Sequence, residues 1–443
     1  MACSSAPSLV DRDSIPAFDG FSREHLLVLS DADMAGFAYA DGKLRQVSGL
    51  RDALTVIEPN SGPRETRSVP ASNSVVGWPG SMAASADGRF VYVIEVRGEV
   101  PDDVEKVQSA YTSLPEGLRL EVFQTAGRGT WASTATMAIG RNPKSVDVAP
   151  DGGWLVAPVE DEGGGLALVR LEDGLPAGAP TLASVDTTEF RRRASDLGPL
   201  YASIDPTGRY IALNLGNTHV GFFEVVFESN GRPAGVKPVG DAVEAGRWIS
   251  MGEWSKDGQM FLVADTGWGP KNLDAVFNGP GAIACVRFDA LGKHEVVSKA
   301  SVSLSPESFA MDPSGELLAV VNMERTYLPF GLPYALFGRR TAHSLSLVQF
   351  DPVSGRLETV DGPLRAEGVL PENAVFDGRG EALAVVTYHE RSEQPITSWV
   401  QFYRVERSED GPRLVPTRHR VEVPRGGHDL LVIPRVSDSV GAR

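Results

Sequence analysis

The sequence predicts an all-β fold, namely a seven-bladed β-propeller with four antiparallel strands in each blade. Three observations predict it. Turns that contain aspartate or proline with glycine recur six times, glycine turns of a second kind recur seven times, and short apolar runs lie on either side of the turns. Repetition of a four-stranded antiparallel unit is typical of propeller blades.

The first family of turns is predicted to join the two innermost strands of each blade. Aspartate bonds its own backbone, glycine adopts positive φ, and proline presets the first turn dihedral. The apolar runs that follow, such as 90–94 and 317–321, predict strands that are covered on both faces. The six turns lie at 86–89, 150–153, 205–208, 256–259, 312–315 and 377–380.

The second family of turns is predicted to join the third strand of each blade to a fourth, more polar strand. The third strands alternate in polarity, as in 221–227 and 344–350, which is typical of strands with two unlike faces. The glycines of these turns are Gly42, Gly127, Gly174, Gly231, Gly292, Gly355 and Gly411.

One blade is predicted to be split between the two ends of the chain, because the second family has one more member than the first. Residues 428–433 would supply its innermost strand, and residues 25–58 the other three. Closing the ring with both ends removes the open sheet edges that invite aggregation. We therefore expect one propeller domain over residues 24–435, with an N-terminal tail at 1–23 and a C-terminal tail at 436–443.

Composition excludes several classes of protein. Lys and Arg total 42 against 58 Asp and Glu, a net charge of −16, so we expect no nucleic-acid partner. No apolar run is long enough for a transmembrane segment. Cys3 and Cys285 cannot form a disulfide framework or a multi-thiolate metal site. Nucleotide-binding loops and haem-attachment motifs are missing from the sequence, so we expect no cofactor.

The first eight residues leave the compartment open. They have neither the charged start nor the apolar centre of a signal peptide, which favours a cytoplasmic protein. The small, serine-rich stretch after Cys3 is also typical of a bacterial lipoprotein whose leader was removed. A periplasmic or lipid-anchored protein, attached through Cys3, is therefore the alternative.

Four long insertions are predicted to emerge on one face of the ring, between the second and third strands of their blades. They span 97–117, 265–281, 323–343 and 388–398, and loops on a rigid scaffold commonly carry function. Within the first, residues 102–111 predict a short helix with acidic residues in its first turn. Residues 326–337 are apolar and aromatic, and they would either cap a ligand pocket or contact a neighbouring blade, a second subunit or a protein partner.

Aligning the innermost strands on their turns brings polar residues to the mouth of the channel. We predict that two carboxyl groups, one imidazole and several cations converge there, a field that would attract a small anionic molecule. The alternative is a set of inter-blade ion pairs around a water-filled channel, and the acidic strand ends Glu95 and Asp265 with Asn322 offer a separate calcium hypothesis. The predicted mouth residues are Glu307, Glu372, His428, Lys144, Tyr201, Arg141, Arg247 and Arg425.

The turns at 204–211 and 311–318 resemble those of the seven-bladed lactonase superfamily, which includes 6-phosphogluconolactonase-like and carboxymuconate cyclase-like proteins. The resemblance covers nearly the whole chain. It implies lactone hydrolysis, or the reverse cyclisation of a small unsaturated carboxylic acid, without a metal. His428 or Glu372 would act as general acid or base with Glu307 as partner, and the substrate would be held by Arg141, Lys144, Arg247, Arg425 and Tyr201.

The sequence departs from the superfamily pattern at the inner strands. Members commonly begin such a strand with Pro-Arg-His, whereas this chain has Pro-Lys-Ser at 143–145, Pro-Glu-Ser at 306–308 and Pro-Glu-Asn at 371–373. The alternative hypothesis is a non-catalytic propeller, tethered to an envelope through Cys3, that binds a ligand or a protein through residues 327–337.

Overall fold

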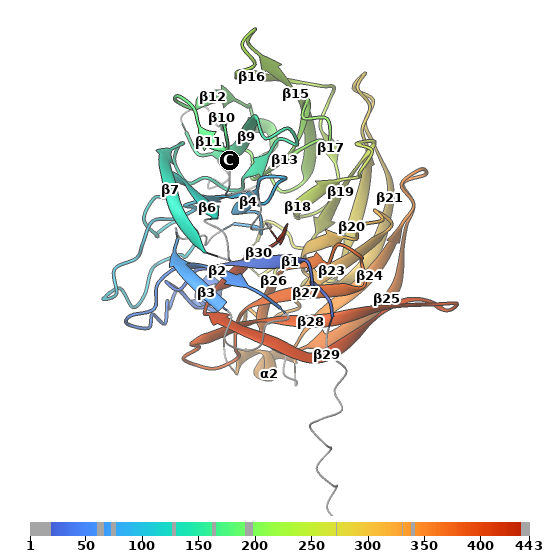
Figure 1. Ribbon diagram of the computed structural model, residues 1–443. Helices are drawn as coiled ribbons and strands as arrows, with labels where there is room; N and C mark the ends of the chain where they lie inside the picture. Colours follow the sequence, from blue (N-terminus) through green and yellow to red (C-terminus); the bar gives the residue numbers. More distant parts are fainter. Residues whose placement is uncertain are drawn as a thin grey trace, which may run out of the picture.

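Seven antiparallel sheets surround a central axis, and they account for nearly all of the regular structure (Figure 1). The computed structural model describes residues 19–59, 66–71, 77–125, 130–161, 165–190, 198–271, 273–329, 331–337 and 342–435. The innermost strands contact one another around a closed ring. The predicted seven-bladed propeller is confirmed.

Each blade has four strands from the channel outward, although the fourth strand is interrupted in two blades. Numbering the blades from the split one, blades 1 to 3 are β30 (Gly427–Pro434), β1 (Glu24–Ser30), β2 (Ala53–Ile57), β3 (Thr66–Pro70); β4 (Met82–Ala84), β5 (Phe90–Ile94), β6 (Arg119–Thr125), β7 (Trp131–Ala138); and β8 (Asp147–Val148), β9 (Trp154–Val159), β10 (Gly165–Glu172), β11 (Leu175–Pro176) with β12 (Thr181–Ser184).

Blades 4 to 7 continue the same order. They are β13 (Tyr201–Ile204), β14 (Tyr210–Leu215), β15 (His219–Phe227), β16 (Pro233–Pro238) with β17 (Val243–Glu244); β18 (Ile249–Trp254), β19 (Met260–Asp265), β20 (Pro280–Arg287), β21 (Glu295–Leu304); β22 (Pro306–Met311), β23 (Leu317–Asn322), β24 (His343–Phe350), β25 (Leu357–Ala366); and β26 (Val369–Phe376), β27 (Ala382–His389), β28 (Thr397–Ser408), β29 (Gly411–Pro424). All six turns of the first family are confirmed, since their glycines at 88, 152, 208, 258, 315 and 380 have φ of 67–80°.

The C-terminal strand closes the ring as predicted. β30 pairs antiparallel with β1, where Val432 lies opposite Leu26 and Leu430 opposite Val28. Two details of the split blade were predicted wrongly. Its outermost strand β3 lies at 66–70 rather than before residue 58, and Gly42 ends the short helix α1 (Ala38–Asp41) instead of forming a hairpin turn. Both errors arise because residues 31–52 form a further insertion between β1 and β2. Gly127 lies outside the described residues.

The apolar core is divided among the seven junctions between neighbouring blades. On β5, Val91 and Val93 pack against blade 1, whereas Tyr92 and Ile94 pack against blade 3. Successive side chains of a strand point to opposite faces, so a strand covered on both sides must be apolar at every position. This explains the continuous apolar runs in the sequence.

A further apolar cluster covers one end of the channel. The insertions and the 31–52 loop pack together here through side chains that include Phe37, Leu44, Leu114, Tyr327 and Tyr388. We call this cluster the cap. The helix predicted at 102–111 is wrong: the segment forms turns and a β-bridge in which Lys106 pairs with Lys43, so contacts with the 31–52 loop replace helical hydrogen bonds. A short helix, α2 (Leu332–Phe337), forms within the aromatic segment instead.

Among the described residues, no helix has the length and apolar character needed to cross a membrane.

Candidate functional site

Three of the predicted mouth residues converge beneath the cap. Glu307, Glu372 and His428 lie at the starts of β22, β26 and β30, the inner strands of three successive blades. His428 Nδ1 lies 3.4 Å from Glu372 Oε2, and the carboxyl groups of Glu372 and Glu307 hydrogen-bond to each other. All three side chains are buried, with 6%, 2% and 1% of Glu307, Glu372 and His428 exposed. We call the two glutamates the carboxyl dyad.

The backbone departs from regular strand geometry at both glutamates of the dyad. Both glutamates follow a proline, and the residues before these prolines, Ser305 and Leu370, have φ of 55° and 49°. The ladder then shifts register around each glutamate, between Pro306 and Ser308 and between Pro371 and Ala374. Bulges at the rims of sheets redirect side chains, and positive φ at residues other than glycine is strained and concentrates at functional sites.

Burial and mutual repulsion set the protonation of the dyad. Burial raises the pKa of Glu307 well above its usual value, and the adjacent Glu372 carboxylate and their shared hydrogen bond raise it further. Burial also raises the pKa of Glu372 well above its usual value; the hydrogen bond from Glu307 opposes the rise and the Asp429 carboxylate adds to it. Two adjacent carboxyl groups do not readily ionise together, and these directions favour Glu307 as the member of the pair that holds a proton.

The imidazole of His428 is neutral. Burial lowers its pKa to about 4, although the Asp429 carboxylate partly opposes this effect. Neither ring nitrogen has a hydrogen-bond partner among the described residues, and the same is true of Oε2 of Glu307 and Oε2 of Glu372. Buried polar atoms are rarely left without partners, so this group of atoms is suited to a polar ligand or to the atoms of a reacting substrate.

Serines on the preceding blades fix the backbone of the dyad. The hydroxyl of Ser250 donates to the carbonyl of Glu307, and that of Ser308 donates to the carbonyl of Glu372, each at 2.6 Å. No motif in the sequence signalled these two contacts.

Tyr201 begins β13, the inner strand of blade 4, whereas the dyad lies on the inner strands of blades 6 and 7. Its ring packs over Gly80, where an added Cβ would lie 2.8 Å from Cε2, and burial raises the pKa of its hydroxyl. Asp429, beside His428, accepts the backbone N–H groups of Gly80 and Met82 at 3.0 Å and so joins blades 1 and 2.

The predicted cations do not gather around the dyad. Arg141 pairs with Glu116 at 3.1 Å and with Asp161 at 3.9 Å, and Lys144 pairs with Glu160. The side chain of Arg247 is exposed. The contact of Arg141, which follows β7 of blade 2, with Asp161, which follows β9 of blade 3, agrees with the inter-blade alternative, whereas Lys144 and Glu160 belong to the same blade.

Arg425 is enclosed instead of lining the mouth. It is fully buried and donates to the carbonyl oxygens of Arg45 at 2.6 Å, of Pro395 at 3.1 Å and of Ala32. The guanidinium thereby ties the 31–52 loop to the last blade.

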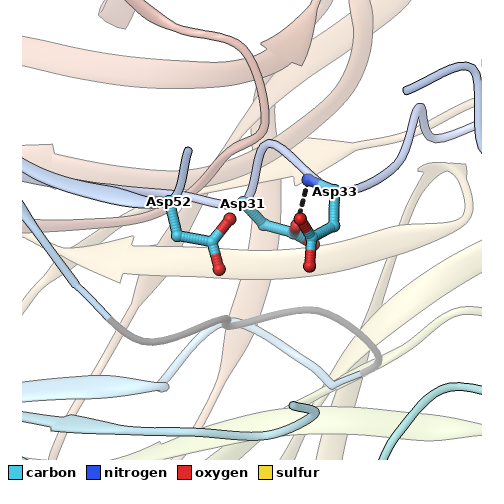
Figure 2. Close-up of side chains that lie close together, drawn as sticks. All are labelled: Asp31, Asp33 and Asp52. Carbon is cyan, nitrogen blue, oxygen red and sulfur yellow. Dashed lines mark hydrogen bonds between the residues drawn. The ribbon is translucent and has the colours of Figure 1, made fainter. Parts of the chain in front are cut away.

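A triad of aspartates beside Arg425 was missed by the sequence analysis. Oxygens of Asp31, Asp33 and Asp52 lie within 4.8 Å of one another (Figure 2). Tyr388 donates to Asp31 at 3.1 Å, and Ala32 N–H donates to Asp52 at 2.8 Å. Burial, followed by repulsion within the triad, raises the pKa of Asp31 and of Asp52. Three carboxyl groups could hold a hard cation, but Arg425 already provides a positive charge nearby. The only signal in the sequence was Asp-x-Asp directly after an apolar strand.

The carboxylate oxygens of the predicted calcium site at Glu95 and Asp265 already have protein partners. Glu95 pairs with Arg119, and Asp265 accepts the backbone N–H groups of Arg247 and Trp248 at 3.0 and 2.9 Å. Asn322 lies in a different blade from Glu95 and Asp265.

Aromatic side chains pack within and beside the cap. The ring centroids of Trp78 and Trp268 are 6.2 Å apart, and those of Trp268 and Tyr327 are 5.7 Å apart. Tyr39 and Tyr111 pack at 5.3 Å, and the charges of Glu372 and Glu307 help to raise the pKa of Tyr39, after burial. The aromatic insertion thus contributes Tyr327 to the cap.

Solved structures resemble the whole chain. Two proteins provisionally named 6-phosphogluconolactonases, from Bacteroides fragilis and Bacteroides uniformis, match with TM-scores of 0.59, 16% identity and 93% of this chain covered, together with 98% and 100% of theirs. The chain shares their fold. A protein of unknown function from Desulfotomaculum acetoxidans matches with a TM-score of 0.56 and 11% identity, over 94% of this chain and 100% of its own.

The predicted resemblance to lactonase-like propellers is therefore confirmed at the level of the fold. No family model matches the sequence, and no curated protein matches it. Identities of this size carry the architecture but not the chemistry, because one fold supports many unrelated sites.

Proposed function

We propose that the protein is an enzyme that hydrolyses a small lactone, or forms one from an unsaturated carboxylic acid, at the capped end of the channel. The observation that carries this proposal is the convergence of Glu307, Glu372 and His428 from three blades, with polar atoms that lack partners within the described residues. In the proposed reaction Glu307 is the protonated member of the pair and Glu372 the ionised one, so that a general acid and a general base lie side by side.

The chemistry of ring opening uses the two carboxyl groups in turn. The Glu372 carboxylate takes a proton from water as the water oxygen bonds to the lactone carbonyl carbon. When the ring C–O bond breaks, the proton of Glu307 passes to the departing alkoxide, which gives a hydroxycarboxylic acid. Transfer of the new proton from Glu372 to Glu307, along their shared hydrogen bond, restores the dyad. Neutral His428 lies beside the base, with Nδ1 3.4 Å from Oε2 of Glu372, and offers its ring nitrogens to the attacking water.

The predicted cations do not gather around the dyad, so an anionic group on the substrate would be held away from the reacting carboxyl groups. Arg141 is one cation that a substrate could recruit, because its side chain is 43% exposed and its ion pairs with Glu116 and Asp161 are at the surface. Surface ion pairs contribute little free energy, so a substrate carboxylate or phosphate can replace them. Lys144, paired with Glu160 and largely buried, is less accessible.

Substrate access requires the cap to move. The dyad and His428 are at most 6% exposed, and the aromatic rings of Trp78, Trp268 and Tyr327 adjoin one another in the cover. Closure over a reaction excludes water and strengthens electrostatic interactions inside.

A non-catalytic binding propeller is the second candidate, and two observations favour it. The channel is covered, and large apolar side chains of the insertions are exposed to solvent, with Leu273 at 65%, Phe277 at 63% and Leu336 at 45%. Apolar side chains grouped at a surface are typical of a protein contact.

A panel of lactones of different ring size, with and without a carboxylate or phosphate group, separates the two candidates. We expect turnover of at least one anionic lactone by the native chain, and a loss of at least a hundredfold in Glu372→Gln, consistent with the loss of a general base. Glu316→Gln, on an exposed turn of β22–β23, is the matched control and should retain full turnover. Equal turnover in native protein and Glu372→Gln would reject the enzyme.

A further inference from the structure

A cavity between blades 6 and 7 lies outside the carboxyl dyad and takes no part in the proposed reaction. Its volume is about 210 Å³, roughly that of seven water molecules in the liquid, so it is far more than a gap for one water. Its walls come from the blade 6 strands β24 and β25 and the blade 7 strands β27, β28 and β29. The residues that matter for its chemistry are His343, Arg365, Glu367, Thr387, Trp399 and Arg420.

Two buried side chains in the wall offer polar atoms without partners. His343 and Thr387 are 2% and 1% exposed, and neither Nδ1 of His343 nor Oγ1 of Thr387 has a hydrogen-bond partner among the described residues. The other ring nitrogen of His343 bonds to the backbone of Gly368, and burial lowers the pKa of the imidazole to about 4. Nδ1 is therefore an unprotonated acceptor, which requires an O–H or N–H donor rather than a second anion.

Two exposed arginines line the same cavity. Arg365 and Arg420 are exposed, and within the described residues neither has a carboxylate partner in ion-pair distance. The guanidinium of Arg420 lies 4.6 Å from the ring centroid of Trp399, and stacking of this kind holds the planar group in one orientation. Glu367 is the one acidic residue of the lining, so the lining is positively charged on balance.

We propose that this inter-blade cavity binds a small hydroxycarboxylate. Its carboxylate would pair with Arg365 and Arg420, while hydroxyl groups would donate to Nδ1 of His343 and exchange a hydrogen bond with Thr387. Guanidinium groups favour two-point contacts with a carboxylate, and the inner acceptor excludes a ligand that is anionic at both ends. Lactone opening yields the same chemical class, but the site is defined by its own groups and does not depend on the proposed function.

Titration calorimetry of the full chain with D-gluconate tests the proposal. Sorbitol has similar hydroxyl groups without a carboxylate, and hexanoate has a carboxylate without hydroxyl groups. We expect gluconate to bind at least tenfold more tightly than either. Arg420→Gln and the isosteric Thr387→Val should each weaken gluconate binding about tenfold, the effect of one hydrogen bond to a charged group or one buried hydrogen bond. Arg418→Gln, an exposed position on the same strand outside the lining, is the matched control.

The experiment can reject the cavity proposal and the proposed enzymatic function independently of each other. Gluconate binding that survives in Glu372→Gln but weakens in Arg420→Gln supports the cavity whether or not any lactone is turned over. Binding that is lost in Glu372→Gln and unchanged in Arg420→Gln places the ligand at the dyad and overturns the proposal. Equal affinity for gluconate, sorbitol and hexanoate also overturns it.

Discussion

The hydroxyl of Ser308 donates a 2.6 Å hydrogen bond to the backbone carbonyl of Glu372 in the next blade. Ser250 makes the equivalent contact with Glu307, so each glutamate of the dyad is held by a serine from the blade before it. The separation of the two carboxyl groups therefore depends on the registration of three consecutive blades. A reaction that moves one proton between these groups requires that registration to be stable.

Replacing Ser308 by alanine should lower the free energy of unfolding by about 1 kcal/mol, because a buried carbonyl loses its donor. Urea denaturation followed by tryptophan fluorescence measures this difference. Ser354→Ala, at an exposed turn between β24 and β25, should change it by less than about 0.5 kcal/mol. Equal losses in the two variants would show that the inter-blade contact contributes nothing.

Glu307→Gln should flatten the dependence of stability on pH. The pKa of Glu307 is raised in the folded chain, so the folded state holds a proton that the unfolded chain has already released. The stability that this proton contributes is present below the unfolded pKa of about 4.3 and is lost as pH rises through the folded value. Urea unfolding of native protein and variant between pH 5 and 8 should diverge with rising pH in favour of the glutamine. A constant difference would contradict the raised pKa.

Burial of neutral His428 should make the folded protein less stable as the pH falls, the opposite pH dependence to that of Glu307. Its pKa falls to about 4 in the folded chain, against about 6.5 when unfolded, so the unfolded state takes up the proton first. The contribution of neutral His428 to the free energy of unfolding is therefore fully present above pH 6.5 and declines as the pH falls towards 4. In His428→Gln this contribution to the decline disappears. A thermal-unfolding series from pH 7 to 4, on native protein and variant, measures it, and parallel curves would mean that the imidazole is not buried neutral.

Arg425→Met should destabilise the chain by about 3 to 5 kcal/mol. The substitution removes the donor to the carbonyl groups of Arg45, Pro395 and Ala32 and a positive charge close to Asp31, Asp33 and Asp52. Arg247→Met is the matched control because that side chain is exposed, and its cost should stay below about 0.5 kcal/mol. Comparable melting temperatures for the two variants would show that Arg425 is not a structural clamp.

Most of the fold could be predicted from local patterns in the sequence. Turn dihedrals, strand alternation and burial on both faces are properties of short segments, so seven blades and a ring closed by the C-terminal strand could be predicted from them. Helix α1 and the 31–52 insertion could not, because their conformation depends on apolar contacts with other insertions rather than on their own periodicity.

The candidate site was predictable in part for the same reason. A repeated strand start places Glu307, Glu372 and His428 at equivalent positions, and a closed ring makes equivalent positions neighbours. The partners of Arg141, Lys144 and Arg425 were not predictable, since an arginine or lysine pairs with whichever carboxylate or carbonyl the loops bring within reach.

By itself, the sequence determined the propeller and its number of blades, because hydrogen-bonded turns and alternating side chains act over a few residues. Only the tertiary structure decided that the channel is covered, that Arg425 is enclosed and that three aspartates meet beside it. Those outcomes depend on how loops from different blades pack against each other. In such packing, the free energy gained by burying apolar surface offsets the cost of desolvating charged groups, and residues far apart in the sequence take part, so no local pattern encodes the result.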